Sequence, residues 1–300
     1  MISRVRREMS QAELKDTFKG DEPRLKSGLR QFYGVVWASL KIMLSYKSWV
    51  IMDLVSTIAS VVMYYFVGLQ VDPTKLSESG WGTSYLTFSI IGVATANYLW
   101  SCLTRLSHSI QHEIRGGTLE AIAVTPVNMF TFFIGQTARG YLVSLIYLLG
   151  VLAVGVAGLG VIFIMNVESL VTALAVFILM LISNQALGLV AAGIIMVYKR
   201  GDPVAFIVAS LNEFLAGVLY PLGMLAAFPI LQAISMSFPY TYALDGIRRA
   251  LILGSSLTDP YVLKDILALS LFSLVLIPVG VYVLDWGYRT IRRKGETSTY

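Results

Sequence analysis

Charged residues are scarce in this chain of 300 residues, where Asp, Glu, Lys and Arg together make up 14%. Soluble domains usually carry about 25%, and a soluble core of this size would lack polar cover for its surface. Hydrophobic residues make up 56% of the sequence, and its mean hydropathy is +0.71. Because lipid can solvate an apolar surface, this composition predicts an integral membrane protein.

Cysteine and histidine are also scarce. Cys102 is the only cysteine, which excludes an intrachain disulfide framework. His108 and His112 are the only histidines, and their spacing of four residues invites a zinc site. The H-E-x-x-H order of such a site is missing, however, and no other ligands cluster nearby. We therefore expect no metal and no cofactor on this chain. The polar, charged start of the sequence also predicts no cleavable signal peptide.

The sequence shows no mark of a catalytic domain. No Gly-rich phosphate loop of the G-x-x-x-x-G-K-[ST] kind occurs, and the longest polar stretch is the first 48 residues. We therefore expect that the chain is not an enzyme, and that any energy for its work comes from a partner or an ion gradient. Its net charge of +5 is better explained by membrane topology than by nucleic-acid binding.

Six apolar runs are long enough to cross a bilayer, since an α-helix needs about 20 residues to span about 30 Å of hydrocarbon. They fall at residues 49–69, 81–104, 128–161, 169–198, 203–221 and 266–284. Pro229, Pro239 and Pro260 interrupt the apolar segment 222–262, which predicts short re-entrant or interfacial helices between the fifth and sixth crossings. The predicted fold is an all-α, polytopic membrane protein with its transmembrane domain at 48–288.

The positive charges indicate how this domain is oriented. With the N-terminus inside, only four of the 23 Lys and Arg residues lie on the outer side, namely Lys75, Arg248, Arg249 and Lys264. The positive-inside rule then predicts that both termini are cytoplasmic, with a segment 1–27 and a tail 289–300 in the cytoplasm. The expected location is the cell (plasma) membrane.

Residues 28–47 carry apolar side chains at helical spacing, with polar residues on the other faces. The aromatic residues Tyr33 and Trp37 would anchor such a helix at the level of the lipid headgroups. The pattern predicts an amphipathic helix lying in the cytoplasmic membrane interface. An ordinary helix that packs on a partner is the alternative.

The predicted cytoplasmic loop 105–128 has the pattern of a short rigid helix. Gly117 ends one helical stretch, Thr118 caps the next, and Pro126 ends it. A stiff helix transmits movement, whereas a Gly/Ser linker does not. The alternative is a plain connecting loop with good caps.

This loop and a downstream segment resemble the type-two ABC exporter permeases, the family of drug and polysaccharide exporters. The loop is similar to the family's E…GTLE…TP signature through Glu113, the run Gly117-Thr118-Leu119-Glu120, and Thr125-Pro126. The downstream segment is similar to its G-x-x-x-P-L turn and P-x-x-Y-A-L-D-x-x-R motif through Gly217, Pro221-Leu222, Pro239, Tyr242-Ala243-Leu244-Asp245 and Arg248. Helix count, orientation and chain length agree over nearly the whole sequence.

The resemblance implies a half-transporter that pairs with a second copy or a homologous permease in the lipid membrane. It implies that two cytosolic ABC ATPase subunits bind it and hold the ATP and Mg. The residues that would couple ATPase movement to the helices are Glu113, Gly117, Thr118, Glu120 and Pro126. The residues that would build an outer re-entrant gate, in an architectural role, are Pro221, Pro239, Tyr242, Asp245 and Arg248. The spacing of Asp245 and Arg248 would let them pair on one helical face.

Glu213 is a charge inside the fifth apolar run, where insertion scales assign a cost of about 2.5–3.5 kcal/mol to such a residue. It stands beside Asn212. One interpretation is a pathway-lining group that attracts cationic or polar substrates. The other is a buried packing group with a hydrogen bond to Asn184 or Gln185.

The expected function is ATP-driven export of a hydrophobic or amphipathic substrate, such as a drug-like molecule or a lipid, from the cytoplasm or inner leaflet. Export of a lipid-linked polysaccharide by the same mechanism is the alternative. An ion-coupled secondary transporter fits less well because it usually shows inverted repeats and midplane charges. A membrane scaffold without transport also stays open. The direction of transport follows from the resemblance alone, and the pattern fits a homodimer and a heterodimer equally.

Overall fold

The computed structural model describes residues 33, 34, 37, 41, 47–70, 76, 80–82, 84–116, 129–198 and 202–294. Within these ranges the chain is helical and contains no strand. The α-helices are α4 (Lys47–Gly68), α6 (Tyr85–Trp100), α7 (Leu106–Arg115), α9 (Met129–Ala153), α10 (Val167–Tyr198), α11 (Asp202–Leu215), α12 (Pro229–Met236), α13 (Pro239–Arg248) and α14 (Pro260–Lys294). Three segments are π-helical, η1 (Ser101–Arg105), η2 (Val154–Gly158) and η4 (Arg249–Leu253), and η3 (Leu222–Ala227) is a 3₁₀-helix.

Among the described residues, four helical spans are long and apolar enough to cross a membrane: Tyr85–Glu113, Gly140–Gly158, Val167–Tyr198 and Pro260–Ile291. Shorter apolar helices run over Ile58–Gly68 and Ala205–Leu215. Large apolar side chains are exposed along the spans, among them Leu267, Leu271 and Leu274 on α14. Lipid can cover these side chains, whereas their exposure to water would be unfavourable. The prediction of an all-helical, multi-pass membrane protein is confirmed at this level.

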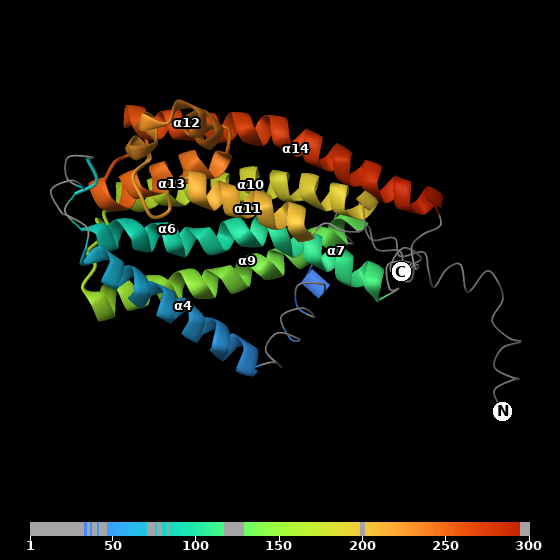
Figure 1. The fold of residues 1–300 in the computed structure, drawn as a ribbon, viewed down its shortest axis with the longest axis horizontal. Coiled ribbons are helices and arrows are strands. Elements are labelled where there is room, and N and C mark those ends of the chain that lie inside the picture. The colour runs from blue at the N-terminus through green and yellow to red at the C-terminus, as the bar shows by residue number, and fades with distance from the viewer. Residues whose placement is uncertain are drawn as a thin grey trace, which may run out of the picture.

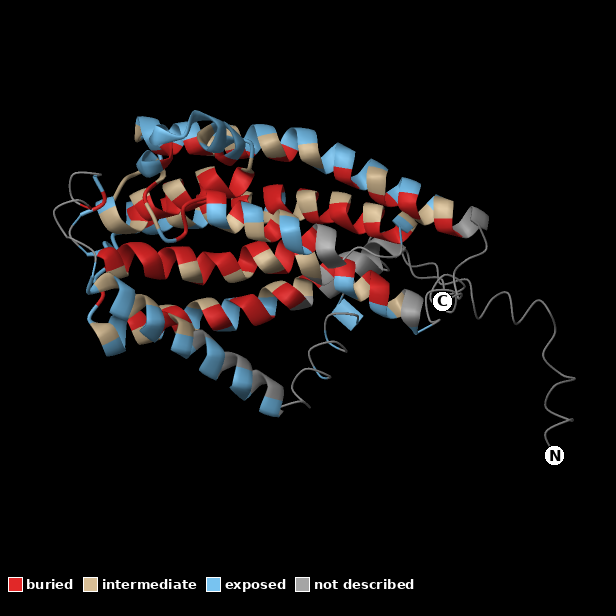
Figure 2. Ribbon diagram, in the orientation of Figure 1, coloured by how far each residue is buried: buried red, intermediate tan, exposed pale blue. Residues whose placement is uncertain are grey.

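The long helices lie side by side in an elongated bundle (Figure 1). α4 begins and α14 ends toward the same end of this bundle, while α12 and α13 gather toward the other end, where α14 begins. Helix α6 lies in the middle and is buried over most of its surface (Figure 2). Its residues Tyr98 and Leu99 belong to a core cluster with Met180 of α10 and Tyr240 of α13.

Helices α10 and α14 approach each other through glycines. A β-carbon on Gly193 would lie 2.4 Å from the carbonyl oxygen of Val283, and one on Gly287 would lie 2.5 Å from the carbonyl oxygen of Gly193. A β-carbon on Gly280 would likewise lie 2.7 Å from the carbonyl oxygen of Ala186. Small residues let membrane helices pack backbone against backbone, where dispersion rather than hydrophobicity holds them together. These glycines therefore fix α14 against α10.

Three predicted crossings differ from the structure. The sixth predicted run is 266–284, but α14 begins at Pro260, inside the predicted re-entrant segment 222–262, and ends at Lys294, inside the predicted tail 289–300. The second predicted run ends at 104, but α6 continues through η1 into α7, so the helix reaches Arg115. The fifth predicted run reaches 221, but α11 ends at Leu215 after 14 residues. Gly217 follows with a φ of +72°, a left-handed conformation that ends a helix. At 1.5 Å per residue α11 is about 21 Å long, which is shorter than the hydrocarbon core.

The predicted interfacial segment 28–47 is described at Tyr33, Gly34, Trp37, Lys41 and Lys47. All five are helical, the first four are exposed, and Lys47 is the first residue of α4. The rings of Tyr33 and Trp37 stack with their centroids 6.3 Å apart. Their position at a membrane surface stays a prediction. The segment 1–27 and most of the coupling loop, 117–128, lie outside the described residues, as does the end of the tail from 295.

Candidate functional site

The candidate site is centred on the junction between α6 and η1. We call Trp100, Ser101 and Cys102 the η1 junction, because these three consecutive residues bond to the two neighbouring helices α11 and α9. The Trp100 indole N–H donates to Oε2 of Glu213 on α11, with 2.6 Å between Nε1 and Oε2. The Ser101 hydroxyl forms a hydrogen bond with the Ser144 hydroxyl of α9.

Cys102 completes the η1 junction. Its sulfur lies 3.1 Å from the hydroxyl oxygen of Tyr141 on α9, and the Tyr141 hydroxyl donates to Oε1 of Gln185 on α10. A π-helical turn carries one extra residue, which changes the direction in which successive side chains point. The turn thus lets one short segment hold α9, α10 and α11 through polar bonds.

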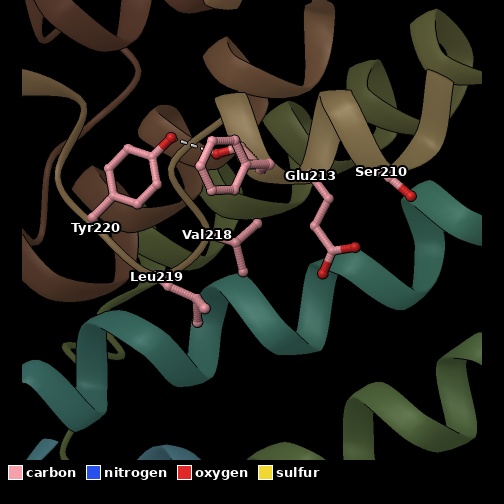
Figure 3. A pocket seen from close by; sticks show the side chains of 6 residues that line it. Ser210, Glu213, Val218, Leu219 and Tyr220 are labelled. Atoms are coloured by element: carbon pink, nitrogen blue, oxygen red, sulfur yellow. Dashed lines mark hydrogen bonds between the residues drawn. The ribbon is translucent and has the colours of Figure 1, made fainter. Parts of the chain in front are cut away.

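Glu213 lies near the C-terminal end of α11 and is half-buried. Figure 3 shows its carboxylate pointing from α11 toward the ribbon of α6. Within the described part of the chain, the Trp100 indole is the one hydrogen-bond donor to this carboxylate, and no ion pair involves it. The predicted packing partners were wrong. Gln185 accepts from Tyr141 instead, and the Asn184 amide donates to the carbonyl of Met180.

A cavity of about 280 Å³ opens beside this carboxylate. We call it the α11 groove, and its lining residues are Ser210, Glu213, Phe214, Val218, Leu219 and Tyr220. The rings of Phe214 and Tyr220 meet edge to face with centroids 5.9 Å apart. The Tyr220 hydroxyl donates to the carbonyl oxygen of Phe214 at 2.5 Å, the dashed line in Figure 3, and so holds the turn after α11 against the helix end.

Asn212, the other residue predicted for a pathway, does not line the groove. Its side chain is fully buried, and its amide nitrogen and oxygen have no hydrogen-bond partner among the described residues. A buried amide without partners is costly. Asn212 therefore belongs to the packed side of α11, whereas Glu213 belongs to its open side.

Arg248 on α13 is a buried cation with 2% of its surface exposed. Its Nε donates to the carbonyl of Phe88 at 3.2 Å, Nη1 to that of Gly217 at 2.7 Å, and Nη2 to that of Val218 at 2.6 Å. The guanidinium carbon lies 3.4 Å from the centroid of the Phe88 ring. Arg248 thus joins α6, α13 and the turn that follows α11.

The predicted pairing of Asp245 with Arg248 is wrong. Asp245 pairs with Arg249, whose Nε lies 2.7 Å from Oδ2 of Asp245. Asp265 of α14 is buried close by with 4% exposure, and its Oδ2 makes no hydrogen bond within the described structure. The Arg249 side chain also lies over the ring of Tyr261, 4.4 Å from its centroid. This cluster links the end of α13 to the start of α14.

The other predicted gate residues lie at helix starts and turns of the same region. Pro239 occupies the first turn of α13, and Pro221 precedes η3. The Tyr242 hydroxyl donates to the carbonyl of Met236 at 3.1 Å, and its ring packs on Phe272 of α14. These contacts fit the architectural role that the resemblance implies, and that role stays a prediction.

Of the predicted coupling residues, Glu113 lies on α7 and is half-buried, while Gly117, Thr118, Glu120 and Pro126 lie outside the described residues. Helix α7 buries Leu106 and Ile110 in a cluster with α10 and α14. His108 and His112 occupy its exposed face. Both histidines therefore lie on the part of the chain that leads into the coupling loop.

Sequence reasoning missed Trp100, Tyr141 and Tyr240 as site residues. Tyr240 is fully buried, and its hydroxyl lies 2.9 Å from that of Thr95. All three residues stand in apolar runs, where an aromatic residue usually indicates packing. Only the polar residues opposite them, which lie at least 39 positions away in the sequence, distinguish them from packing residues.

Comparison with known proteins leaves the function to be argued from these contacts. No family model matches the sequence, and a search of curated proteins finds no match. The multi-pass, helical character of the membrane protein rests on the four apolar spans of its own chain.

Proposed function

We propose that the chain is the membrane-spanning subunit of an ATP-driven exporter, which moves a hydrophobic or amphipathic molecule out of the cytoplasm or inner leaflet with a separate ATPase. The observation that carries the proposal is the unbroken helix Tyr85–Arg115, which we call the α6–α7 rod. It joins the η1 junction and the α11 groove to Glu113 and the loop with the coupling signature.

The length of the rod supports this role. The span Tyr85–Glu113 has 29 residues, or about 44 Å at 1.5 Å per residue. This exceeds the hydrocarbon thickness of about 30 Å, so the rod would extend well beyond the lipid on the cytoplasmic side. A force applied to that end would reach the η1 junction through a continuous hydrogen-bonded helix. The junction's polar bonds would pass the movement to α9, α10 and α11.

The membrane topology that we propose has six crossings, with both termini cytoplasmic in the plasma membrane. The short α11 would cross together with the chain that follows it, and α12 and α13 would be re-entrant helices at the outer end. The bonds that support this proposal satisfy backbone groups inside the bundle, as lipid requires. The Ser235 hydroxyl of α12 donates to the carbonyl of Leu215 at 2.8 Å, and Arg248 serves Gly217 and Val218.

The coupling contact would be made by Glu113, Gly117, Thr118, Glu120 and Pro126 on two ATPase subunits, one for each permease of a dimer. Transport of this kind needs a substrate site with access to the membrane. The α11 groove offers one because it is lined mainly by apolar and aromatic side chains.

Co-purification tests this proposal. The tagged chain is extracted from the membranes of its own host in mild detergent, and retained ATPase subunits and ATP hydrolysis are measured. We expect a retained ATPase whose hydrolysis is faster than that of the isolated subunit. Glu120→Arg should remove at least nine-tenths of the retained ATPase, because an opposite charge would be forced into the coupling contact. Glu168→Arg, on the exposed first turn of α10, is the matched control and should retain it.

Accessibility labelling tests the topology separately. Cys102→Ser provides a background without cysteine, and Thr118→Cys then introduces a single thiol in the coupling loop. A membrane-impermeant maleimide should label this thiol in inverted vesicles and not in intact cells. Labelling from outside the cell would refute the exporter proposal. Transport that collapses with the proton gradient while ATP persists would favour an ion-coupled transporter instead.

A further inference from the structure

We propose that the α11 groove binds a lipophilic organic cation, meaning a quaternary ammonium or phosphonium centre that carries apolar groups. This deepens the proposed function by naming a substrate class, and only the claim that the cation is exported depends on that function. The binding site itself follows from the shape and chemistry of the groove.

Among the described residues that line the groove, Glu213 is the one that carries a charge. Its Oε2 accepts the short bond from the Trp100 indole, which fixes the direction of the carboxylate. Its Oε1 is left to face a ligand, since no described residue donates to it. An anion would be repelled here, and a neutral ligand would displace water from the carboxylate without replacing it. A cation is attracted into the groove and compensates the negative charge of the Glu213 carboxylate.

The remaining walls favour an organic cation over a metal ion. Phe214 and Tyr220 present their rings to the groove, and Val218 and Leu219 present aliphatic side chains. Aromatic faces attract cations electrostatically and pack on apolar groups at the same time. A metal ion such as Mg²⁺ or Ca²⁺ needs about six oxygen ligands, whereas the lining offers one carboxylate and the hydroxyls of Ser210 and Tyr220. Tyr220 already uses its proton on Phe214.

Arg248 is a buried cation, and it makes its contacts with other groups. Its Nη2 donates to the carbonyl of Val218, and its guanidinium carbon lies 3.4 Å from the centroid of the Phe88 ring. Among the described residues no cation forms an ion pair with Glu213, so its negative charge is available to a ligand.

The aromatic wall lies on the open side of α11. Phe214 is 64% exposed, whereas Asn212 and Leu215 beside it are buried. Lipid can cover this ring when no ligand is bound, so its exposure leaves the groove accessible from the bilayer. The cavity, at about 280 Å³, has the volume of about nine water molecules at 30 Å³ each. This is sufficient for a charged centre and its first apolar substituents, while larger groups would extend into lipid.

Direct binding tests the inference. The purified chain is placed in lipid nanodiscs without ATP or any ATPase, and equilibrium binding of tetraphenylphosphonium is measured by titration. The wild type should bind one equivalent saturably. Glu213→Gln should weaken binding at least tenfold, because it removes the charge and keeps the shape. Glu168→Gln removes the same charge from an exposed position on α10 and should leave the affinity within twofold.

Two further measurements guard against a variant that merely misfolds. Phe214→Leu changes an exposed ring, so it should fold normally and still weaken tetraphenylphosphonium binding several-fold. Tetraphenylborate, which has the same shape and the opposite charge, should show no loss of binding in Glu213→Gln. Equal tetraphenylphosphonium affinity in the wild type and Glu213→Gln would overturn the inference. So would a wild type that binds no cation, and this failure would leave the ATPase association of the proposed exporter untouched.

Discussion

Replacing Arg248 tests whether this buried cation holds α6, α13 and the turn after α11 together. Arg248→Met keeps much of the volume but removes the donor to the carbonyl of Phe88 and leaves the carbonyls of Gly217 and Val218 without their side-chain donors. An unsatisfied buried group costs about 1–3 kcal/mol, and loss of a desolvated cation–π contact costs about 2 kcal/mol more. Relief of the desolvation of the guanidinium offsets part of this sum. We expect a net destabilisation of about 3 kcal/mol.

The assay is thermal unfolding of the detergent-solubilised protein, followed by intrinsic fluorescence. A loss of about 3 kcal/mol corresponds to a fall in Tm of about 6–12 °C for a chain of this size class. Arg248→Lys should fall between the wild type and Arg248→Met, because an ammonium group keeps the charge but not the planar fork that serves two carbonyls. Arg249→Met is the control next door. Its pair with Asp245 is partly exposed, at 21% and 18%, and its side chain lies over the Tyr261 ring, so we expect a cost of about 1–2 kcal/mol, which is smaller than that of Arg248→Met.

The reasoning would be refuted by two results. One is an Arg248→Met protein that unfolds within about 1 °C of the wild type, a difference too small for the loss of three donors to backbone carbonyls. The other is an Arg249→Met protein that loses as much stability as Arg248→Met, since a general effect of charge at this end of the bundle would then explain both.

Three further predictions concern other contacts of the fold. Gly193→Ala should destabilise the protein by about 1–3 kcal/mol, because the new β-carbon would lie 2.4 Å from the Val283 carbonyl oxygen. Gly223→Ala is the control and should have little effect in the same unfolding assay, because nothing lies within 4 Å of its new β-carbon. Equal effects of the two variants would contradict the close packing of α10 and α14. Ser235→Ala should cost about 1–3 kcal/mol by leaving the Leu215 carbonyl unpaired, and Ser237→Ala on the exposed side should cost much less in chemical denaturation. Asp259 lies outside the spans, and hydrogen bonds from the Ser255 hydroxyl and the Tyr261 N–H lower its pKa from the ordinary 3.8. The stability that it adds is therefore present above the ordinary pKa and lost as the pH falls through the lowered one. Asp259→Asn should lose less stability than the wild type between about pH 6 and about pH 3, and an unchanged profile would argue against this capping role.

The sequence allowed prediction of the helices that lipid surrounds, because a helix that contacts lipid needs a long run of apolar residues. It did not allow prediction of where α6 and α11 end. The stretch Leu106–Arg115 is polar and lies beyond the second predicted run, yet it continues α6 because its apolar residues recur on one helical face. The sequence indicated Pro221 as the end of α11, but the helix ends earlier, because Gly217 adopts a left-handed conformation. Many other glycines of the chain do not adopt this conformation, so a glycine alone does not predict the end of a helix.

The candidate site was predicted in part. Glu213 was found because a charge in an apolar run is exceptional on its own helix. Its partner Trp100 lies 113 positions away, and nothing in a single sequence reports which helix will lie opposite. The acceptors of Arg248 are backbone carbonyls, which every residue has. A search for an acidic partner therefore selected Asp245, which in the structure pairs with Arg249.

The π-helical turn η1 has a geometric consequence for the α6–α7 rod. Such a turn stores one residue more than an α-helical turn, and this residue can move along a helix if each hydrogen bond shifts in succession. Each residue that the extra residue passes turns by about 100° about the helix axis and moves by about 1.5 Å along it. Residues between the old and the new position of the turn would thus face different neighbouring helices, while the parts of the rod on either side keep their orientation relative to each other.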